Sequence, residues 1–415
     1  MEFGTAAIGK GWKTVKKLLV LGGAEAQVPI IQAAKKEGYY VVLCDWTTTN
    51  PGIKDADKHY QVSTLDRDAV IRIAVEEKID GVISNSEPAM LNVSYIAEEL
   101  HLRGNPVSGL EMLLSKDRFR SLQKTVGVYA PEHFIVKNEK EFLAVAKKMP
   151  CPFVVKPAAS SGSRGTTKVL SYNAEELKKI YRINAGYSRD TCCVIEDYVD
   201  MPSLTTIEGE LFVLDREILW DGLFFNARSS ITPKLPMTYS MPFRIDPLKE
   251  IVIQETVRKL LEAADFTYGE LNVEMYFTKD DRLFVIEINP RQGGASLPAF
   301  VFRHCGIDMY KLLVTTAVND DRYFNSLKQF NRECHYITRH SVFSHAAGVY
   351  KGISCSQTIQ SYVKKIEERV LCGNTVEACN NGTEVLAFVD LEFGSYELQH
   401  QYCDNLEEFI KPIIV

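Results

Sequence analysis

The chain has 415 residues, 46% of them hydrophobic and 25% charged, with a formal net charge of −6. This length exceeds one ordinary hydrophobic core and predicts two or three domains. The negative balance argues against general binding to nucleic acid or acidic membranes, and no apolar run is long enough to span a bilayer. The 10 cysteines lack metal-ligand spacing, so we expect reduced thiols in a cytoplasmic protein and no zinc site.

The N-terminal part of the chain predicts a parallel β-α-β unit. Residues 1–16 lack the apolar core of a signal peptide and are expected to be an extension outside the fold. Apolar runs at 18–21 and 40–44 flank a helical pattern that ends near residue 37, which indicates an α/β domain over 17–110. Gly22, Gly23 and Asp45 suggest a dinucleotide site only weakly, because the G-x-G-x-x-G spacing is missing. A tight turn is the favoured interpretation.

The remainder predicts an α+β pattern rich in antiparallel pairs. Strands are expected at about 205–213, 217–226, 268–278 and 282–289, with a helix over about 248–264. Residues 224–245 read as a long irregular stretch, a kind of segment that is often functional. Residues 321–415 predict short strands and one helix around 359–369.

Two neighbouring apolar runs carry polar side chains at alternate positions. These are Glu270, Asn272 and Glu274 on the first run, and Glu287, Asn289 and Arg291 on the second. A short polar connection predicts a hairpin, and a loop of even length would place Glu274 opposite Glu287. An odd length would break that pairing. Opposed carboxylates need a cation, and oxygen ligands beside an amide suit Mg²⁺ or Mn²⁺. The alternative is an edge hairpin with solvated acids.

A loop of small residues follows Lys156 at the end of another apolar run. The segment AASSGSRGTT would let backbone N–H groups approach phosphate oxygens, and Arg164 could add a charged fork. The lysine precedes the glycines, so this is not the P-loop pattern. Taken alone, an ordinary flexible hairpin tip remains equally open.

Five motifs carry a resemblance to a known superfamily. They are Lys116 in LSKDRF, Lys156 in VVKPAASSGSRGT, the segment VIEDYV, Glu274 in NVEM, and IEINPR. Their order and spacing over about residues 20–320 resemble the ATP-grasp superfamily, most closely the dipeptide-forming L-amino acid ligases. The resemblance implies an ATP-grasp fold with mixed α/β and α+β architecture. A Rossmann-like domain would span 17–110, an ATP-grasp domain 111–320 with a central lid subdomain at about 130–200, and a C-terminal α+β region 321–415 would complete the catalytic unit.

The resemblance also implies roles for individual residues. Lys116 and Lys156 would contact ATP phosphates, with Lys156 also near the adenine. The lid loop would close over the phosphates through Ser160, Ser161, Gly162, Ser163, Arg164 and Gly165, and the hinge that reads adenine would comprise Glu196, Asp197, Tyr198 and Val199. Glu274, Glu287 and Asn289 would hold two Mg²⁺ ions, and Arg291 would stabilise the transferring phosphoryl group or the acyl phosphate.

The chain departs from the family at the ribose position. The segment after the hinge is DMPSLTTIEGE, which leaves the ribose contact unassigned, with Glu208 a candidate only in a different register.

Substrate residues are less clearly indicated. Arg228 and Arg244 could receive a substrate carboxylate, and Gly293 and Gly294 would allow close approach to the backbone. Tyr239 and Met237 fit either a pocket wall or the core. The histidines His304, His335, His340 and His345 show no catalytic or metal spacing and are expected to be structural.

The implied activity is ATP-dependent ligation of a small-molecule carboxylate to an amine, in the first instance two amino acids, through an acyl phosphate with release of ADP and phosphate. A carboxylase or carbamoyl-phosphate-type activity is an alternative, disfavoured because the chain shows no glutaminase-like or biotin-carrier region. A non-catalytic ATP-binding module is a second alternative, disfavoured by the intact acidic and Arg291 positions. Neither nucleic acid nor membrane is expected as a partner, and a homodimer is left open.

Overall fold

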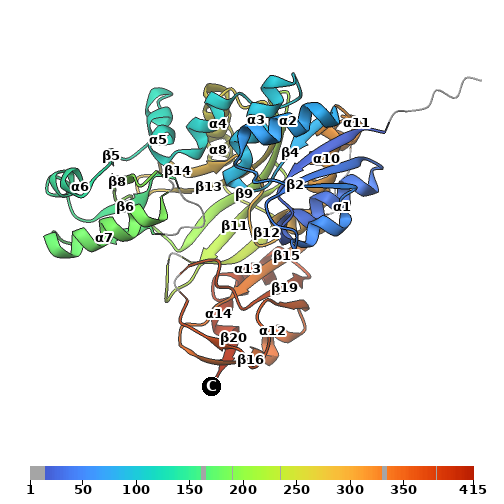
Figure 1. The fold of residues 1–415 in the computed structure, drawn as a ribbon. Coiled ribbons are helices and arrows are strands. Elements are labelled where there is room, and N and C mark those ends of the chain that lie inside the picture. The colour runs from blue at the N-terminus through green and yellow to red at the C-terminus, as the bar shows by residue number, and fades with distance from the viewer. Residues whose placement is uncertain (1–14, 160–164, 189, 234, 330–333, 380) are drawn as a thin grey trace, which may run out of the picture.

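The computed structural model describes residues 15–159, 165–188, 190–233, 235–329, 334–379 and 381–415 (Figure 1). The lid-loop residues 160–164 and most of the expected N-terminal extension therefore lie outside the described residues. Among the described helices, none combines the length and apolarity needed to cross a membrane.

The N-terminal unit is a four-stranded parallel sheet in the order β3-β2-β1-β4. Its strands are β1 (Lys17–Leu21), β2 (Tyr40–Asp45), β3 (Lys58–Gln61) and β4 (Gly81–Ile83); its helices are η1 (Glu25–Gln27), α1 (Val28–Lys36), η2 (Pro51–Asp55), α2 (Arg67–Glu77), η3 (Glu87–Ala89) and α3 (Met90–Glu99). The predicted β-α-β unit is confirmed. The Asp45 carboxylate accepts hydrogen bonds from Gly23 N at 2.7 Å and from the Asn50 amide at 2.8 Å. These hydrogen bonds give Asp45 a structural role in the turn, as the favoured interpretation of the sequence expects.

The centre of the molecule is a nine-stranded sheet with the order β14-β13-β9-β11-β12-β15-β19-β17, and β10 pairs with β9. Its strands are β9 (Thr205–Leu214), β10 (Glu217–Leu219), β11 (Leu223–Arg228), β12 (Pro236–Met241), β13 (Tyr268–Phe277), β14 (Leu283–Asn289), β15 (Tyr336–Val342), β17 (Val363–Glu368) and β19 (Ala387–Phe393). Strands far apart in the sequence thus become neighbours.

The two faces of this sheet are covered by different layers. Helix α8 (Pro247–Ala263) packs Val257 and Leu260 against Leu271 and Val273 of β13. On the other face, Phe212 and Phe224 join a core shared with the N-terminal unit and three helices. These helices are α9 (Leu297–Cys305), α10 (Met309–Ala317) and α11 (Arg322–Leu327).

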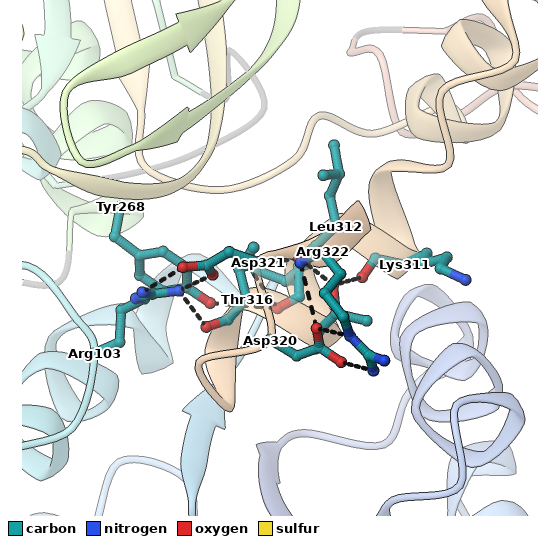
Figure 2. Close-up of polar contacts among 10 residues, drawn as sticks. Arg103, Tyr268, Lys311, Leu312, Thr316, Asp320, Asp321 and Arg322 are labelled. Atoms are coloured by element: carbon teal, nitrogen blue, oxygen red, sulfur yellow. Dashed lines mark hydrogen bonds and ion pairs between the residues drawn. The ribbon is translucent and has the colours of Figure 1, made fainter. Parts of the chain in front are cut away.

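Arg103, just after α3, connects the N-terminal unit to the end of α10 through hydrogen bonds (Figure 2). Its guanidinium donates to the Thr316 carbonyl oxygen at 2.9 Å and to Asp321 Oδ2 at 3.0 Å. An arginine that caps helix carbonyls while pairing with a carboxylate uses several of its fixed donors at once, which favours one relative position of the two segments.

A separate four-stranded antiparallel sheet, β5-β8-β6-β7, lies on the side of the molecule away from α1 (Figure 1). Its elements are β5 (His133–Val136), α6 (Glu139–Ala146), β6 (Phe153–Pro157), β7 (Thr167–Val169), α7 (Ala174–Tyr187) and β8 (Cys193–Asp197), and the preceding helices are α4 (Val107–Leu114) and α5 (Lys116–Thr125). Phe142, Phe153, Leu177 and Ile195 form its own hydrophobic core. A core of its own allows this part to move as a unit.

The C-terminal part completes the central sheet and adds a small one. The small sheet has the order β18-β16-β20, with β16 (Gly348–Cys355), β18 (Thr375–Val376) and β20 (Ile410–Ile414). Helices α12 (Gln357–Gln360), α13 (Tyr396–Cys403) and α14 (Leu406–Phe409) accompany it. The domain limits proposed from the sequence stay predictions.

Three local expectations from the sequence are wrong. The helix expected around 359–369 is the short α12 followed by strand β17, because 363–368 pairs with β19 and Ile366 takes part in that ladder. The stretch 224–245 contains strand β12, which lies between β11 and β15. The strand expected over 217–226 is interrupted at 220–222, between β10 and β11. Gly222 in this break lies so close to Glu210 that a Cβ there would be 1.7 Å from the Glu210 carbonyl oxygen.

Candidate active site

A row of three carboxylates crosses three neighbouring strands. Glu274 on β13 lies directly opposite Glu287 on β14 and Glu208 on β9. The predicted Glu274–Glu287 pairing is confirmed. The Arg228 guanidinium, from the end of β11, reaches the same row, with Nη2 at 3.4 Å from Glu274 Oε2 and 4.0 Å from Glu208 Oε1. The predicted substrate arginine is therefore close to the predicted metal ligands.

The Glu274–Glu287 pairing does not arise from the loop of even length that the sequence analysis expects. Near the turn, Phe277 pairs with Leu283, and Thr278 N donates to the Arg282 carbonyl at 2.9 Å, so the loop is of odd length. A β-bulge opposite Glu274 and Met275 then shifts the register and restores the Glu274–Glu287 pair. A bulge adds one residue to one strand, which is what an odd loop requires.

A second polar row lies next to the first. Asn272 is opposite Asn289 and Glu210, and its Nδ2 donates to Glu210 Oε1 at 2.7 Å. The backbone N of Gly293 donates to both Glu210 oxygens at 2.9 Å. A Cβ on Gly293 would stand 2.4 Å from Glu210 Oε1, whereas Gly294 has nothing within 4 Å of its Cβ position. Gly293 is thus needed for close approach to Glu210; contact of either glycine with a substrate stays a prediction.

The crowded acids do not share the same charge state. Burial, with the neighbouring carboxylates, raises the pKa of Glu208 to about 7 and that of Glu274 to about 8. Burial would also raise the pKa of Glu287, but Lys116, the Asn289 hydrogen bond, Arg291 and Lys156 together lower it. Glu287 therefore holds its negative charge more readily than Glu208 and Glu274, as expected for like charges in one site.

Lys156 on β6 is held by a buried ion-pair network. Its ammonium contacts the Glu196 carboxylate, which also accepts from Arg120 Nε at 3.0 Å. Burial would raise the pKa of Glu196, but Lys156 and Arg120 lower it to about 2. The side chain of Glu196 thus orients Lys156, and any contact of this residue with adenine would fall to its backbone.

The rest of the expected hinge joins β8 to β9. The Asp197 N donates to the Glu132 carbonyl at 2.9 Å, and the Val199 carbonyl accepts from Tyr276 Oη at 2.8 Å. Lys168 Nζ lies 3.5 Å from the centre of the Tyr198 ring, a cation–π contact. The loop that would cover the phosphates lies outside the described residues at Ser160, Ser161, Gly162, Ser163 and Arg164. Gly165, which follows it, has φ +77°, a conformation suited to glycine.

Arg291 connects the strand end to the N-terminal unit. Its Nη2 lies 2.9 Å from Glu87 Oε2 at η3, and its Nη1 donates to the Gln292 carbonyl at 2.9 Å. Sequence reasoning singled out Arg291 but missed Glu87, which is 204 residues away in the chain. A single polar residue in a helical turn carries no local signal of such a partner.

The donor set fits magnesium. Among the described residues, no three Asp, Glu, His or Cys side chains form a complete protein cage for a metal ion. Mg²⁺ is instead usually held by one or two carboxylates, with phosphate oxygens and water completing the shell. Glu274, Glu287 and Asn289 match that pattern. Asn289 uses its amide nitrogen to donate to Glu287 Oε1 at 2.8 Å, so its oxygen is the atom suited to a cation.

Other candidates make local contacts, and of these Tyr239 lies on the same face of the sheet as the carboxylate row, opposite Asn226. Arg244 packs over Tyr396, with its guanidinium carbon 4.5 Å from the ring centre. Tyr239 is buried in the core against Phe224. Two histidines are engaged locally: His304 Nδ1 is 2.6 Å from the His335 carbonyl, and His335 Nδ1 is 3.3 Å from Glu392. These contacts agree with structural roles.

Comparison with known proteins agrees with this geometry. Residues 18–106 match the PylC-like N-terminal domain family, and residues 121–295 match the ATP-grasp domain family. This chain contains an ATP-grasp domain. The ATP-grasp match covers Lys156, both polar rows and Gly293, whereas Glu87, Lys116 and Arg120 of the site described above precede it.

Individual relatives are distant. The C-terminal section of the carbamoyl phosphate synthase large chain from Aquifex aeolicus (strain VF5) is 25% identical over 323 residues, which are 73% of this chain and 58% of that relative. The L-amino acid ligase from Bacillus licheniformis superposes with a TM-score of 0.77 at 20% identity, covering 97% of this chain and 100% of the ligase. The biotin carboxylase domain of a Hydrogenobacter thermophilus 2-oxoglutarate carboxylase, solved with MgADP, superposes with a TM-score of 0.68 at 16% identity. This superposition covers 97% of this chain and 92% of the carboxylase domain. Such likeness establishes the ATP-grasp fold of this chain.

Proposed function

We propose that this ATP-grasp protein is an ATP-dependent carboxylate–amine ligase that joins two amino acids. The observation that carries the proposal is the gathering of charge around Glu287. Lys116 from α5, Lys156 from β6 and Arg291 from the end of β14 all act on the pKa of this one carboxylate. Three cations from separate segments beside paired acids provide what a polyphosphate and its metal require.

Each group has a distinct task in this proposal. Lys116 and Lys156 bind ATP phosphates, while Glu196 and Arg120 keep the Lys156 ammonium in place. Glu274, Glu287 and Asn289 would hold Mg²⁺, in two ions, which neutralises phosphate charge during transfer. Mn²⁺ is expected to substitute because it accepts the same oxygen ligands.

The reaction would proceed in two transfers. An oxygen of the substrate carboxylate attacks the γ-phosphorus, the bond to the β-phosphate oxygen breaks, and ADP leaves. The amine then attacks the acyl carbon, the carbon–oxygen bond to phosphate breaks, and an amide forms with loss of a proton. Arg291 would stabilise the charge on the transferring phosphoryl group and the acyl phosphate, and Arg228 or the backbone at Gly293 and Gly294 would bind the substrate.

The lid is proposed to protect this intermediate. The sheet of β5–β8 has its own core, and the hinge at 196–199 is the covalent link to β9. Closure over the phosphates would exclude water from the acyl phosphate. The structural likeness to an L-amino acid ligase over almost the whole chain supports a carboxylate–amine reaction more directly than the carboxylase alternative. Homodimerisation and a cytoplasmic location stay predictions.

The test is phosphate release from ATP and Mg²⁺ with each amino acid singly and in pairs, followed by mass spectrometry of the products. We expect release that depends on a particular pair, with an equal amount of condensed product. The Glu287→Gln variant should lose both, whereas Glu132→Gln, an exposed change, should keep them. ATP binding without release for any pair would contradict the dipeptide proposal. Release with bicarbonate alone would favour the carboxylase.

A further inference from the structure

A cavity of about 290 Å³ lies in the C-terminal part of the molecule, between the β12–β15 pair and the α14–β20 segment. It is lined mainly by apolar residues, among them Ile231, Met237 and Ile414, and its polar lining residues are His340, Ser344, His345, Glu407 and Lys411. None of these residues takes part in the ATP-grasp site.

The cavity is on the opposite face of the sheet from the carboxylate row. Asn226 donates to Glu208 and lies opposite Tyr239, which in turn lies opposite Arg339. Arg339 therefore shares the face of the row. Side chains alternate along a strand, so the next residue, His340, points to the other face. A ligand in this cavity would be distinct from the nucleotide and the reacting substrates.

His340 provides an unsatisfied polar group inside the cavity. Its side chain is 0% exposed, and its Nδ1 is 2.8 Å from Thr238 Oγ1. Its Nε2 has no hydrogen-bond partner among the described residues. Burial lowers the pKa of His340 to about 4, so the imidazole is neutral at physiological pH. A buried polar atom without a partner is costly, and a ligand that bonds to it removes that cost.

The volume of the cavity and the residues that line it indicate the size and charge of the ligand. The cavity is roughly twice the ~150 Å³ of an engineered apolar cavity that binds benzene. Three of the other polar wall groups are paired with protein: Ser344 Oγ donates to the Ala346 carbonyl, His345 Nε2 is 2.8 Å from Glu407 Oε1, and Glu407 accepts from Ser229 Oγ at 2.9 Å. Lys411 also lines the cavity, but it is an exposed residue whose ammonium is hydrated. A charged head would meet no free counter-charge at His340. We propose that this cavity binds a small neutral molecule with a compact apolar body and an amide or hydroxyl head that bonds to His340 Nε2.

The site has a direct connection to the catalytic face. Glu407 also accepts from Ser230 N at 3.1 Å and Ser230 Oγ at 3.0 Å. Ser229 and Ser230 follow Arg228, whose guanidinium reaches Glu274. A ligand that contacts Ile231 and Glu407 therefore touches the segment that positions an active-site arginine.

The probe for the test is 4-methylpentanamide. Its branched apolar body suits the walls, and its amide can donate to or accept from His340 Nε2 in either tautomer. It has neither the carboxylate nor the amine of the proposed substrates. Full-length protein with isotope-labelled histidine is titrated with the probe, and the His340 signal is assigned by its loss in His340→Phe. We expect a saturable shift of the His340 imidazole signal, while the signal of His335 stays in place.

Two neighbouring residues provide matched variants. Ile414→Trp places an indole into the cavity, whereas Ile413 does not line it, is 42% exposed, and its replacement by Trp serves as the control. Affinity for the probe should fall at least tenfold in Ile414→Trp and stay unchanged in Ile413→Trp and in Glu287→Gln. No His340 shift up to the solubility limit, equal loss in both Trp variants, or loss in Glu287→Gln would overturn the proposal. None of these readouts requires ligase activity, so failure here and failure of the proposed function are separable.

Discussion

Glu196 on β8 is ion-paired with Lys156 on the neighbouring strand β6, and its side chain is only 3% exposed. Arg120 donates to the other carboxylate oxygen, so one buried anion compensates two cations. Such a cluster is stable only when complete, because each charge has lost its contact with water.

Removal of this anion should destabilise the protein strongly. Glu196→Gln would leave Lys156 and Arg120 buried without a counter-charge, at a cost of about 3–5 kcal/mol. Urea denaturation measures the change in the free energy of unfolding. Glu132→Gln is the matched control, because that carboxylate is 69% exposed and its pair with Lys124 should contribute less than about 1 kcal/mol. Similar losses in the two variants would contradict the role given to Glu196.

Divalent cation binding should strengthen as the pH rises from about 6 to 8. The raised pKa values of Glu208 and Glu274, about 7 and about 8, mean that these carboxyls hold protons which a cation must displace. Loss of a single proton predicts up to about a tenfold gain in affinity per pH unit. Mn²⁺ binding followed by electron paramagnetic resonance at several pH values measures this dependence.

Arg228→Met provides the control for this pH dependence. The guanidinium lowers the pKa of both acids, so its removal should move the rise in affinity to higher pH. An affinity for Mn²⁺ that is flat between pH 6 and 8 would show that the protons lie elsewhere.

Glu210→Gln should stabilise the protein more at pH 8 than at pH 5. Burial raises the pKa of Glu210 from 4.5 to about 8, against the hydrogen bonds from Gly293 and Asn272. Above pH 4.5 the unfolded chain releases this proton and the folded protein keeps it, so folding loses up to about 1.4 kcal/mol per pH unit until pH 8. The amide removes this loss and still accepts through one oxygen. Thermal unfolding in EDTA at both pH values tests the difference, and an effect independent of pH would refute it.

Gly293→Ala should disrupt the second polar row, whereas Gly294→Ala should be tolerated. The new Cβ at 293 would stand 2.4 Å from Glu210 Oε1 and 2.8 Å from Asn272 Nδ2, and both of these side chains are buried. Overpacking of this kind costs about 1–3 kcal/mol. Circular dichroism melts and ATP-dependent phosphate release in both variants measure the contrast. A neutral Gly293→Ala would show that the row adapts.

The hairpin illustrates how far sequence reasoning reaches. Alternation of polar and apolar residues placed Glu274, Glu287 and Asn289 on one face, and the pairing of the two acids is confirmed. The loop length expected for that pairing is wrong, and the bulge that compensates for it has no clear local signature. A bulge depends on how the paired strands pack against the rest of the fold, which short-range patterns do not report.

The sequence by itself determined the hairpin strands, their polar faces and the order of the predicted phosphate and metal motifs, because strand periodicity and short turns act between residues close along the chain. The tertiary structure alone decided which further groups join them. It inserted β9 between β13 and β11, which brought Glu208, Glu210 and Arg228 to the acids, and it set Glu87 against Arg291 and Arg120 against Glu196. These contacts come from strand order and from packing between distant segments. Burial there shifts the pKa of each acid in a way that no single residue type predicts.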